Sequence, residues 1–180
     1  HMNLDTMELP PVVATERFDL RPLRQSDSGL YTHYASDERL ARMTPAIPHP
    51  LPPGAAEAWV TRAHAQDRTE EIWAIDGTRT GGSELMGVIA LERMDEKQAE
   101  ISYWVAPPFW NTGLASEAVQ ALVDANPLNN ATLFASVFQD NPASARVLVH
   151  CGFAYIGDAE ATCLARGEAV PTWTYLRKLG

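Results

Sequence analysis

The stretch from Pro107 to Ala118, "PPFWNTGLASEA", constrains the fold more than any other part of the sequence. Its two prolines end the alternating segment before them, because proline lacks the N–H group that the interior of a strand or helix requires. Gly113 follows at a position suited to a tight turn, and helical spacing of apolar residues begins at Leu114. This order predicts a strand, a turn and an amphipathic helix in immediate succession.

The predicted helix has an apolar and a polar face. Its apolar stripe consists of Leu114, Ala118, Leu122 and Ala125, and its polar face carries Glu117, Gln120 and Asp124. The first turn of such a helix has N–H groups without intrahelical partners, and the helix dipole adds about half a positive charge there. A pyrophosphate is therefore favoured at this end even without a lysine.

The residues of the turn are small enough to admit such an anion. Gly113 lets a ligand approach the backbone, Ala115 is small for the same reason, and Ser116 adds a hydroxyl donor. An ordinary strand, turn and helix with a glycine for geometry alone fits the same residues and stays the alternative.

The segment before the junction predicts an antiparallel meander. Glu71 to Ile75, Leu85 to Leu91 and Gln98 to Val105 are strand-like, and the turn-rich "DGTRTGGSE" separates the first two. In the third run, apolar residues occupy every second position. The alternation therefore places Glu100 on the face opposite to the apolar row, together with Ser102.

The N-terminal part predicts one strand and three helices. Phe18 to Leu23 alternates as a half-buried strand, with Pro22 marking an edge or an end. Ser26 to Arg42 has helical spacing that is interrupted near its middle, which indicates two short helices. Five prolines forbid a regular helix in residues 44–54, and the helical pattern resumes from Gly54 to Asp67.

The C-terminal part predicts a strand, a helix and a second strand pair. Ala131 to Val137 is a short apolar run, and Asp140-Asn141-Pro142 has the residues of a helix cap and first turn, with Gly152 closing the helix. Phe153 to Ile156 and Thr172 to Arg177 are expected to pair as strands around a loop of residues 157–171.

Length and composition predict one globular domain. The chain has 180 residues, 46% of them hydrophobic, with no internal repeat and no low-complexity linker. We expect a single domain over residues 15–180 and an N-terminal extension over residues 1–14, in which His1-Met2 is a remnant of an expression tag. The sequence has neither a membrane-length apolar run nor a signal peptide pattern, which predicts a cytoplasmic protein.

The charge balance and the cysteines exclude further classes. A formal net charge of −9 disfavours a surface that neutralises phosphates, so nucleic acid is not expected as the main partner, and a small or cationic partner fits better. Cys151 and Cys163 lack the spacing of a metal site or a disulfide framework, so both are interpreted as reduced thiols and no metal is expected.

Three motifs in order resemble the GNAT superfamily of acyl-CoA-dependent N-acyltransferases: "AEISYWV", "FWNTGLASEA" and "NPASARVLVHCGF". More narrowly they are similar to the RimJ/RimL-type branch, whose members carry a Trp-x-x-Gly-x-Ala turn. Each motif is loose alone, but the three together extend a likeness that begins near Thr15 over nearly the whole chain. The resemblance implies the GNAT fold, a mixed α/β fold with a mostly antiparallel sheet, flanking helices and a V-shaped opening between two central strands.

The resemblance also implies acetyl-CoA as the acyl donor. It assigns the CoA pyrophosphate to the backbone amides of Thr112, Gly113, Leu114, Ala115 and Ser116, counts Asn111 of the same turn among the cofactor-binding residues, and assigns the pantetheine arm to the strand end at Tyr103, Trp104 and Val105. Asn141 and Ser144 would face the thiol end of the cofactor. A plain helix cap is the alternative role for Asn141.

Two side chains carry the expected catalysis. Glu100 lies where many family members have a carboxylate, so the resemblance implies a general base, with a solvated glutamate or an ion pair as the alternative. Ser144 would hydrogen-bond the sulfur or protonate the leaving thiolate.

Many GNAT enzymes have a tyrosine as general acid at the position of Leu148, and leucine cannot replace it. Asn111 and Thr112 likewise occupy turn positions where many relatives have Arg or Lys.

The acceptor is expected to be a primary amine, for this branch the α-amine of a protein or peptide. A small amine such as a polyamine or an aminoglycoside-like compound stays open, as does a non-catalytic acyl-CoA-binding module that regulates a partner. Residues 26–67 and 157–172 are expected to bind the acceptor and carry no readable substrate signature. The resemblance is compatible with a monomer or a homodimer.

Overall fold

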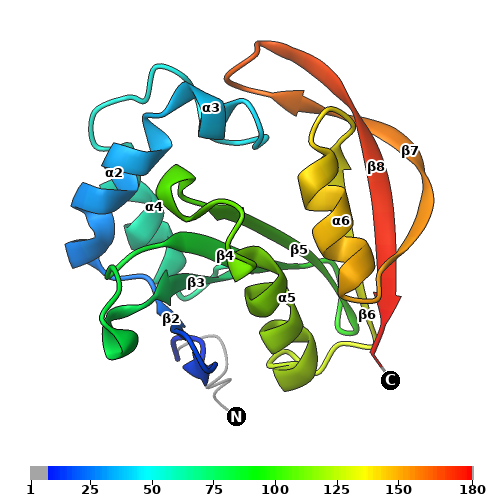
Figure 1. Ribbon diagram of the computed structural model, residues 1–180, viewed down its shortest axis with the longest axis horizontal. Helices are drawn as coiled ribbons and strands as arrows, with labels where there is room; N and C mark the ends of the chain where they lie inside the picture. The colour runs from blue at the N-terminus through cyan, green and yellow to red at the C-terminus, as the bar shows by residue number, and fades with distance from the viewer. Residues whose placement is uncertain (1–7, 180) are drawn as a thin grey trace.

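The computed structural model describes residues 8–179, so the pair interpreted as a tag remnant, His1-Met2, lies outside the described residues. The described chain forms an eight-stranded sheet in the order β1-β2-β3-β4-β5-β6-β8-β7. Every neighbouring pair is antiparallel except β5 and β6, which are parallel. The predicted mixed, mostly antiparallel sheet with flanking helices is confirmed (Figure 1).

The strands are β1 (Val13–Ala14), β2 (Asp19–Pro22), β3 (Glu70–Asp76), β4 (Gly87–Arg93), β5 (Gln98–Val105), β6 (Thr132–Phe138), β7 (Ala154–Cys163) and β8 (Glu168–Lys178). The α-helices are α2 (Ser28–Ala35), α3 (Glu38–Ala41), α4 (Ala55–Ala63), α5 (Leu114–Ala125) and α6 (Pro142–His150). Short 3-10 helices occur at η1 (Gln25–Asp27), η2 (Thr78–Thr80) and η3 (Pro107–Phe109). Between residues 8 and 179, each helix is too short or too polar to cross a bilayer.

Most predicted elements occur where the sequence places them. The two short helices, the meander β3-β4-β5 and the succession from β5 through η3 to α5 are all present. The helix after Gly54 ends at Ala63, short of the predicted end. In α5, Val119 and Val123 complete the buried stripe, whereas Ala125, predicted to belong to it, is exposed because it is the last residue of the helix.

The first described residues also join the sheet. Val13 and Ala14, which the sequence assigns to the extension before the domain, form β1 and pair with β2. The indole Nε1 of the buried Trp73 donates to the carbonyl of Pro11 at 2.8 Å. This segment therefore covers the edge of β2.

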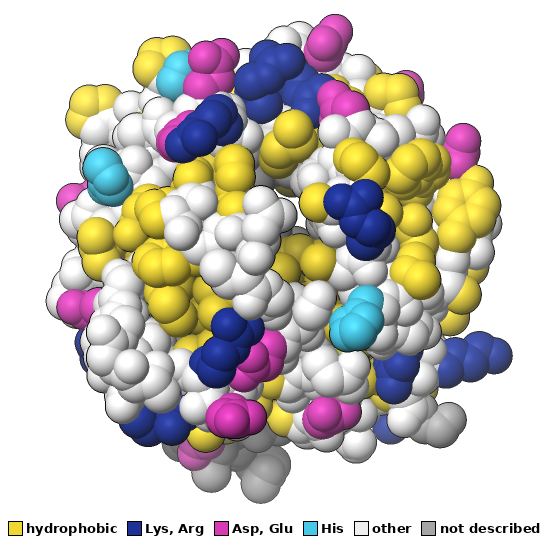
Figure 2. All heavy atoms as spheres, in the orientation of Figure 1, with side chains coloured by type: hydrophobic (Ala, Val, Ile, Leu, Met, Phe, Trp, Pro, Cys, Tyr) yellow, Lys and Arg dark blue, Asp and Glu magenta, His cyan; other side chains and the backbone are white. Residues whose placement is uncertain are grey.

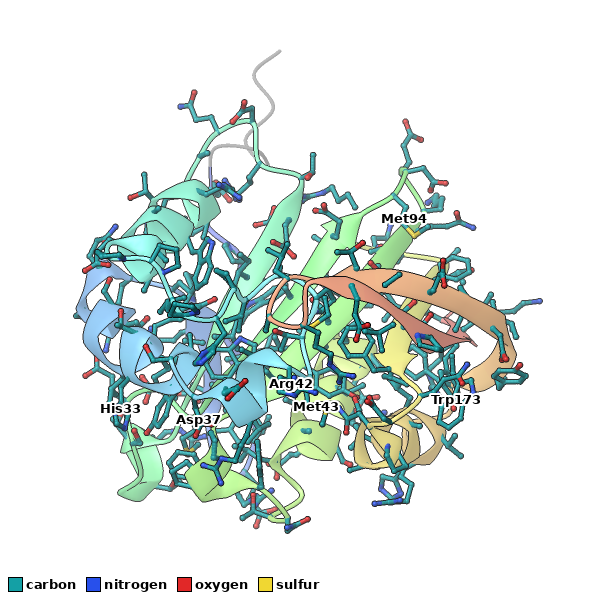
Figure 3. The ribbon with its side chains drawn as sticks, turned by 90° about the horizontal axis from the view of Figure 1, so that it is seen from above. His33, Asp37, Arg42, Met43, Met94 and Trp173 are labelled. Carbon is teal, nitrogen blue, oxygen red and sulfur yellow. The ribbon has the colours of Figure 1, made fainter. Side chains whose placement is uncertain are left out.

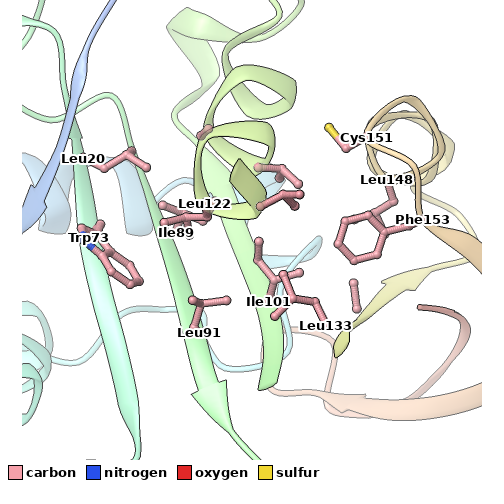
Figure 4. Close-up of a cluster of buried hydrophobic side chains, with 14 of the residues drawn as sticks. Leu20, Trp73, Ile89, Leu91, Ile101, Leu122, Leu133, Leu148, Cys151 and Phe153 are labelled. Carbon is pink, nitrogen blue, oxygen red and sulfur yellow. The ribbon is translucent and has the colours of Figure 1, made fainter. Parts of the chain in front are cut away.

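Helices cover both faces of the sheet. α5 and α6 pack over the main core, where Trp73, Ile101 and Leu148 are among the buried side chains (Figures 1 and 4). α2 and α4 cover the other face over a second core. Because successive strand residues face opposite sides, Ile101 joins the main core while Glu100 and Trp104 face the α2 and α4 side, as the alternation predicts.

The only parallel pair of the described sheet separates soon after it begins. β5 and β6 are in register at three positions, the last of which pairs Glu100 with Phe134. Both strands then continue separately, while β5 stays paired with β4 as far as Val105. The V-shaped opening between the two central strands is therefore present, and Glu100 lies at its apex.

The last two strands are longer than the sequence predicts. Most of the expected loop 157–171 is strand, because β7 extends to Cys163 and β8 begins at Glu168. The prediction was wrong because β7 is exposed along most of its length and lacks the apolar alternation that signals a strand. Pairing across the hairpin defines this ribbon instead.

The tip of the β7-β8 ribbon reaches the loop that follows α3 (Figures 1 and 3). The thiol of Cys163 lies 3.3 Å from the carbonyl oxygen of Thr44. Arg166 donates to the carbonyl of Arg42 at 2.6 Å and pairs with Asp140 at 2.6 Å. These contacts join the C-terminal ribbon to the N-terminal helices across the V-shaped opening.

Candidate functional site

The described residues enclose a cavity of about 2270 Å³ in the V-shaped opening. Figure 2 shows a hollow near the centre of this face with hydrophobic side chains inside it. The cavity brings together every site residue that the sequence predicts: Glu100, Tyr103, Trp104, Val105, Asn111, Thr112, Gly113, Leu114, Ala115, Ser116, Asn141 and Ser144. The positions come from β5, the turn, α5 and α6.

The turn before α5 has the bare backbone that the sequence predicts. Gly113 is the N-cap residue with φ +78°, and Asn111 also has a positive φ of +62°. Neither conformation is readily adopted by most side chains. The indole of Trp110 fixes the turn by donating to the carbonyl of Val105 at 2.6 Å. The start of α5, with its N–H groups and dipole, lines the cavity.

A cation that the local sequence does not reveal lies beside this turn. Arg17 donates to the carbonyl of Thr112 at 3.0 Å and pairs with Glu117 at 2.6 Å. Burial alone would raise the pKa of the Glu117 carboxyl, but the hydrogen bonds from Arg17 and Thr15, together with the charge of Arg17, outweigh burial and lower that pKa. The turn lacks its own Arg or Lys, and tertiary structure brings one from 95 residues away.

One edge of β5 is available to a ligand beyond the apex of the V. The ladder to β6 ends at Glu100, whereas the ladder to β4 includes Tyr103, Trp104 and Val105. The β6-facing backbone groups of these residues therefore have no strand partner within the described sheet. Buried backbone groups require hydrogen-bond partners, so an amide-containing chain that enters the cavity would satisfy them.

Glu100 ends a row of three carboxylates across the sheet. In the cross-strand register, Glu70 lies opposite Glu92, and Glu92 lies opposite Glu100. Burial raises the pKa of the Glu100 carboxyl, and the neighbouring charge of Glu92 raises it further. Burial and Glu92 act in the same direction on Glu70, whose pKa is also raised despite the nearby Arg62. A carboxylate with a raised pKa is suited to accept a proton near neutral pH.

Ser144 and Asn141 belong to the start of α6. Asn141 occupies the N-cap position, as the sequence predicts, but its side chain makes no capping hydrogen bond. Ser144 faces the cavity and contacts Tyr103, whose hydroxyl lies 2.9 Å from the serine Oγ. Leu148, one turn further along, is fully buried in the main core and has only a packing role.

Aromatic side chains line the cavity on the α2 and α4 side. Tyr31 packs against Trp59 and Trp104, with ring centroids 5.3 Å and 5.4 Å apart. Of the five tryptophans, Trp59, Trp104 and Trp110 line the cavity. Trp73 lies in the main core instead. The aromatic wall therefore shares the cavity with the carboxylates of Glu70 and Glu100.

Comparison with known protein families identifies the family to which the chain belongs. A profile described as an acetyltransferase (GNAT) domain matches residues 17–154. The chain belongs to the GNAT acetyltransferase family. Its expected class, an N-acetyltransferase, is therefore confirmed.

Individual relatives agree with this family. The uncharacterized N-acetyltransferase YoaA of Bacillus subtilis (strain 168) is 28% identical over 148 residues, which cover 79% of this chain and 82% of that protein. The solved structure of RimL, a ribosomal L7/L12 alpha-N-protein acetyltransferase in complex with coenzyme A, matches with a TM-score of 0.80 at 18% identity, covering 94% of this chain and 98% of that chain.

A second matching structure is that of an acetyltransferase named for a different kind of acceptor. Spermidine N-acetyltransferase from Vibrio cholerae, in complex with CoA and spermine, matches with a TM-score of 0.77 at 16% identity, covering 92% of this chain and 97% of that chain. The two structures confirm the GNAT fold. They do not distinguish the RimJ/RimL-type branch, because both groups match about equally well.

The GNAT motifs find the cavity but not all of its polar side chains. Glu70 lines the cavity, Arg17 contacts the turn and Glu92 lies opposite Glu100, yet none of the three belongs to a motif, since each is positioned by strand register or by the docking of the N-terminal segment. The contact between Tyr103 and Ser144 joins two motifs that the sequence treats separately. Within residues 8–179, no group of three or more His, Cys, Asp or Glu side chains is arranged to hold a metal ion.

Proposed function

We propose that this protein transfers an acetyl group from acetyl-CoA to a primary amine, the α-amine of a protein or peptide. The observation that carries the proposal is the continuity of the cavity from the α5 turn, along the unpaired edge of β5, to Glu100. An acyl donor held at the turn and along the strand would present its thioester near the apex of the V, within the same cavity as the carboxylate.

The residues present fit the donor. Backbone N–H groups from Thr112 to Ser116, with the α5 dipole, would hold the pyrophosphate, and Arg17 adds a cation beside them. The edge of β5 at Tyr103 to Val105 would pair with the amides of the pantetheine arm. Asn141, whose side chain is not engaged in capping, would contact the arm near its thiol end.

The chemistry requires a base and a donor for the leaving group. Near pH 7 roughly a tenth of an α-amine is neutral, against about one in a few thousand lysine side chains, so Glu100 would remove the surplus proton directly or through water. The amine nitrogen then forms a bond to the carbonyl carbon, with backbone N–H groups of β5 stabilising the oxyanion. The carbon–sulfur bond breaks, the thiolate accepts a hydrogen bond or proton from Ser144, and the extra proton on the new amide nitrogen leaves to water, so that an amide and a thiol are formed.

The carboxylate row favours a second candidate acceptor, a small polyamine. Glu70 lies across β4 from Glu100 and also lines the cavity, and the raised pKa values of Glu70 and Glu100 identify two places where a positive charge is favourable. A peptide α-amine places one charge in the cavity, whereas a polyamine places two or more. The RimL and spermidine acetyltransferase structures represent these two kinds of acceptor among relatives of the same fold.

Thiol release with acetyl-CoA tests both acceptors. The panel contains a peptide with a free α-amine, the same peptide with a blocked N-terminus, and spermidine. We expect turnover that requires the free amine and falls about 10²-fold or more in Glu100→Gln. Binding of CoA without turnover for any amine, unaffected by Glu100→Gln, would support a non-catalytic acyl-CoA-binding module instead. Preference for the free peptide or for spermidine decides the acceptor class.

A further inference from the structure

Tyr103 and Ser144 form a hydrogen-bonded pair across the V-shaped opening. The tyrosine hydroxyl lies 2.9 Å from the Oγ of Ser144 and 3.1 Å from its backbone carbonyl oxygen. Tyr103 belongs to β5 and Ser144 to the first turn of α6, and both line the cavity. The pair therefore connects two elements at a level where β5 and β6 no longer pair.

The tyrosine hydroxyl stays protonated over the working pH range. Burial raises the pKa of Tyr103 well above its ordinary value and outweighs the opposing hydrogen bond with Ser144. The buried thiol of Cys151 is a further titratable group near it and acts in the same direction. The pair therefore has two hydroxyl hydrogens to distribute among the available acceptors.

The two hydroxyl hydrogens of Tyr103 and Ser144 can form hydrogen bonds in two alternative arrangements. If Tyr103 donates to the Ser144 carbonyl, the serine hydroxyl can donate to the tyrosine oxygen, and its hydrogen is then used inside the pair. If Tyr103 donates to Oγ instead, the serine hydrogen is directed away from the pair and is available to a group in the cavity. A hydroxyl that accepts one hydrogen bond also becomes a stronger donor of another.

We propose that Tyr103 is a positioning residue that orients the Ser144 hydroxyl hydrogen toward the sulfur of the departing CoA. This inference rests on the proposed function. As the carbon–sulfur bond breaks, its electron pair moves to sulfur, Tyr103 donates to Oγ, and Ser144 donates a hydrogen bond to the thiolate. The thiolate leaves hydrogen-bonded to Ser144 and takes its proton from solvent, while Tyr103 and Ser144 keep their own hydrogens.

Calorimetric binding of CoA and desulfo-CoA at about pH 9, where an ordinary thiol is largely ionised, isolates the contact to sulfur. We expect the wild type to bind CoA about tenfold more tightly than desulfo-CoA, because a hydrogen bond to a charged acceptor contributes that much or more. The preference should disappear in Ser144→Ala and fall several-fold in Tyr103→Phe. The matched control is Tyr155→Phe, which removes an exposed hydroxyl on β7 and should leave the preference unchanged.

Turnover supplies the second readout. Tyr103→Phe should lower kcat about tenfold with KM for acetyl-CoA changed less than about twofold, and it should have no further effect in a Ser144→Ala background. Tyr103→Phe keeps the ring, so thermal unfolding should shift by only about 2–4 °C. If it unfolds the protein, Ser144→Ala alone still tests the sulfur contact, and an unchanged CoA preference in that variant refutes the inference.

The outcomes separate this inference from the function on which it rests. Equal kcat and equal CoA preference in Tyr103→Phe and wild type would overturn the positioning role, as would effects of the two substitutions that add independently. Absence of CoA binding, or of turnover with every amine, in the wild type would overturn the proposed function itself.

Discussion

The clearest test of the donor site is the substitution Gly113→Ala at the start of α5. Gly113 has φ +78° and ψ +7°, a left-handed conformation that costs a residue with a Cβ roughly 1–2 kcal/mol. Apart from its chain neighbours, the nearest atom to an added Cβ is the Nη2 of Arg17, at 3.7 Å, which is an ordinary contact. The protein itself therefore tolerates the methyl group.

Gly54 provides a matched control elsewhere in the same chain. It is the N-cap residue of α4, with φ +79° and ψ +2°, and an added Cβ would meet no atom within 4 Å. Gly54→Ala and Gly113→Ala should thus lower the free energy of unfolding by the same amount, about 1–2 kcal/mol. Gly113 lines the cavity, and Gly54 is not among the lining residues.

Only the turn of α5 should lose CoA affinity. A methyl group at Gly113 would occupy the approach of the pyrophosphate to the backbone N–H groups and weaken one or two charge-assisted hydrogen bonds. Each contributes about 1.5–3 kcal/mol, which corresponds to roughly a 10- to 100-fold rise in Kd. Isothermal titration with CoA measures the Kd, and urea unfolding of the free proteins measures the shared cost of backbone strain.

The comparison of the two variants can refute this reasoning. If Gly113→Ala binds CoA as tightly as Gly54→Ala while both are destabilised equally, the turn does not hold the donor through its backbone. A loss of affinity in both variants would instead trace the effect to general destabilisation.

Two further predictions concern charged side chains. Glu92→Gln removes the like charge opposite Glu100, so the raised pKa of Glu100 should fall. In a plot of kcat/KM against pH, the acidic limb should therefore move to lower pH. If the limb does not move, Glu100 is not the titrating base. Arg21 pairs with the buried Asp27 and with Asp76, both at 2.7 Å, so Arg21→Met should cost about 3–5 kcal/mol in urea unfolding at pH 7. Burial alone would raise the pKa of Asp76, but hydrogen bonds from Arg21 and Thr78 lower it, so this stabilisation is present above the ordinary pKa and is lost as pH falls through the lowered value. The stability difference between the wild type and Arg21→Met should therefore shrink as the pH falls below the ordinary aspartate pKa of about 3.9; a constant difference would contradict the role assigned to Asp76.

The local sequence determined those helices and strands in which apolar residues recur with the period of the element because one face packs against a core. The alternation of β5 placed Glu100 on the correct face, because a strand directs neighbouring side chains to opposite sides. The prolines, Gly113 and the helical stripe located the turn and α5, because each acts on the backbone where it stands. Three such motifs in order were sufficient for the family.

The β7-β8 ribbon shows where that reasoning fails. β7 is exposed along most of its length, so burial imposes no apolar period on its residues. What defines the ribbon is backbone pairing across the hairpin and the contacts of its tip, Cys163 and Arg166, with residues more than 100 positions earlier. Neither is visible in a local window.

The sequence alone determined the fold class, the family and the residues along β5, α5 and α6 that surround the donor site. Only the tertiary structure decided which charges and hydroxyls meet there: the register that aligns Glu70, Glu92 and Glu100, and the docking that brings Tyr103 to Ser144. The physical reason is the separation along the chain over which each kind of interaction acts. Periodicity and turn chemistry act within a few residues, whereas electrostatic and hydrogen-bonded partners are set by the packing of whole elements.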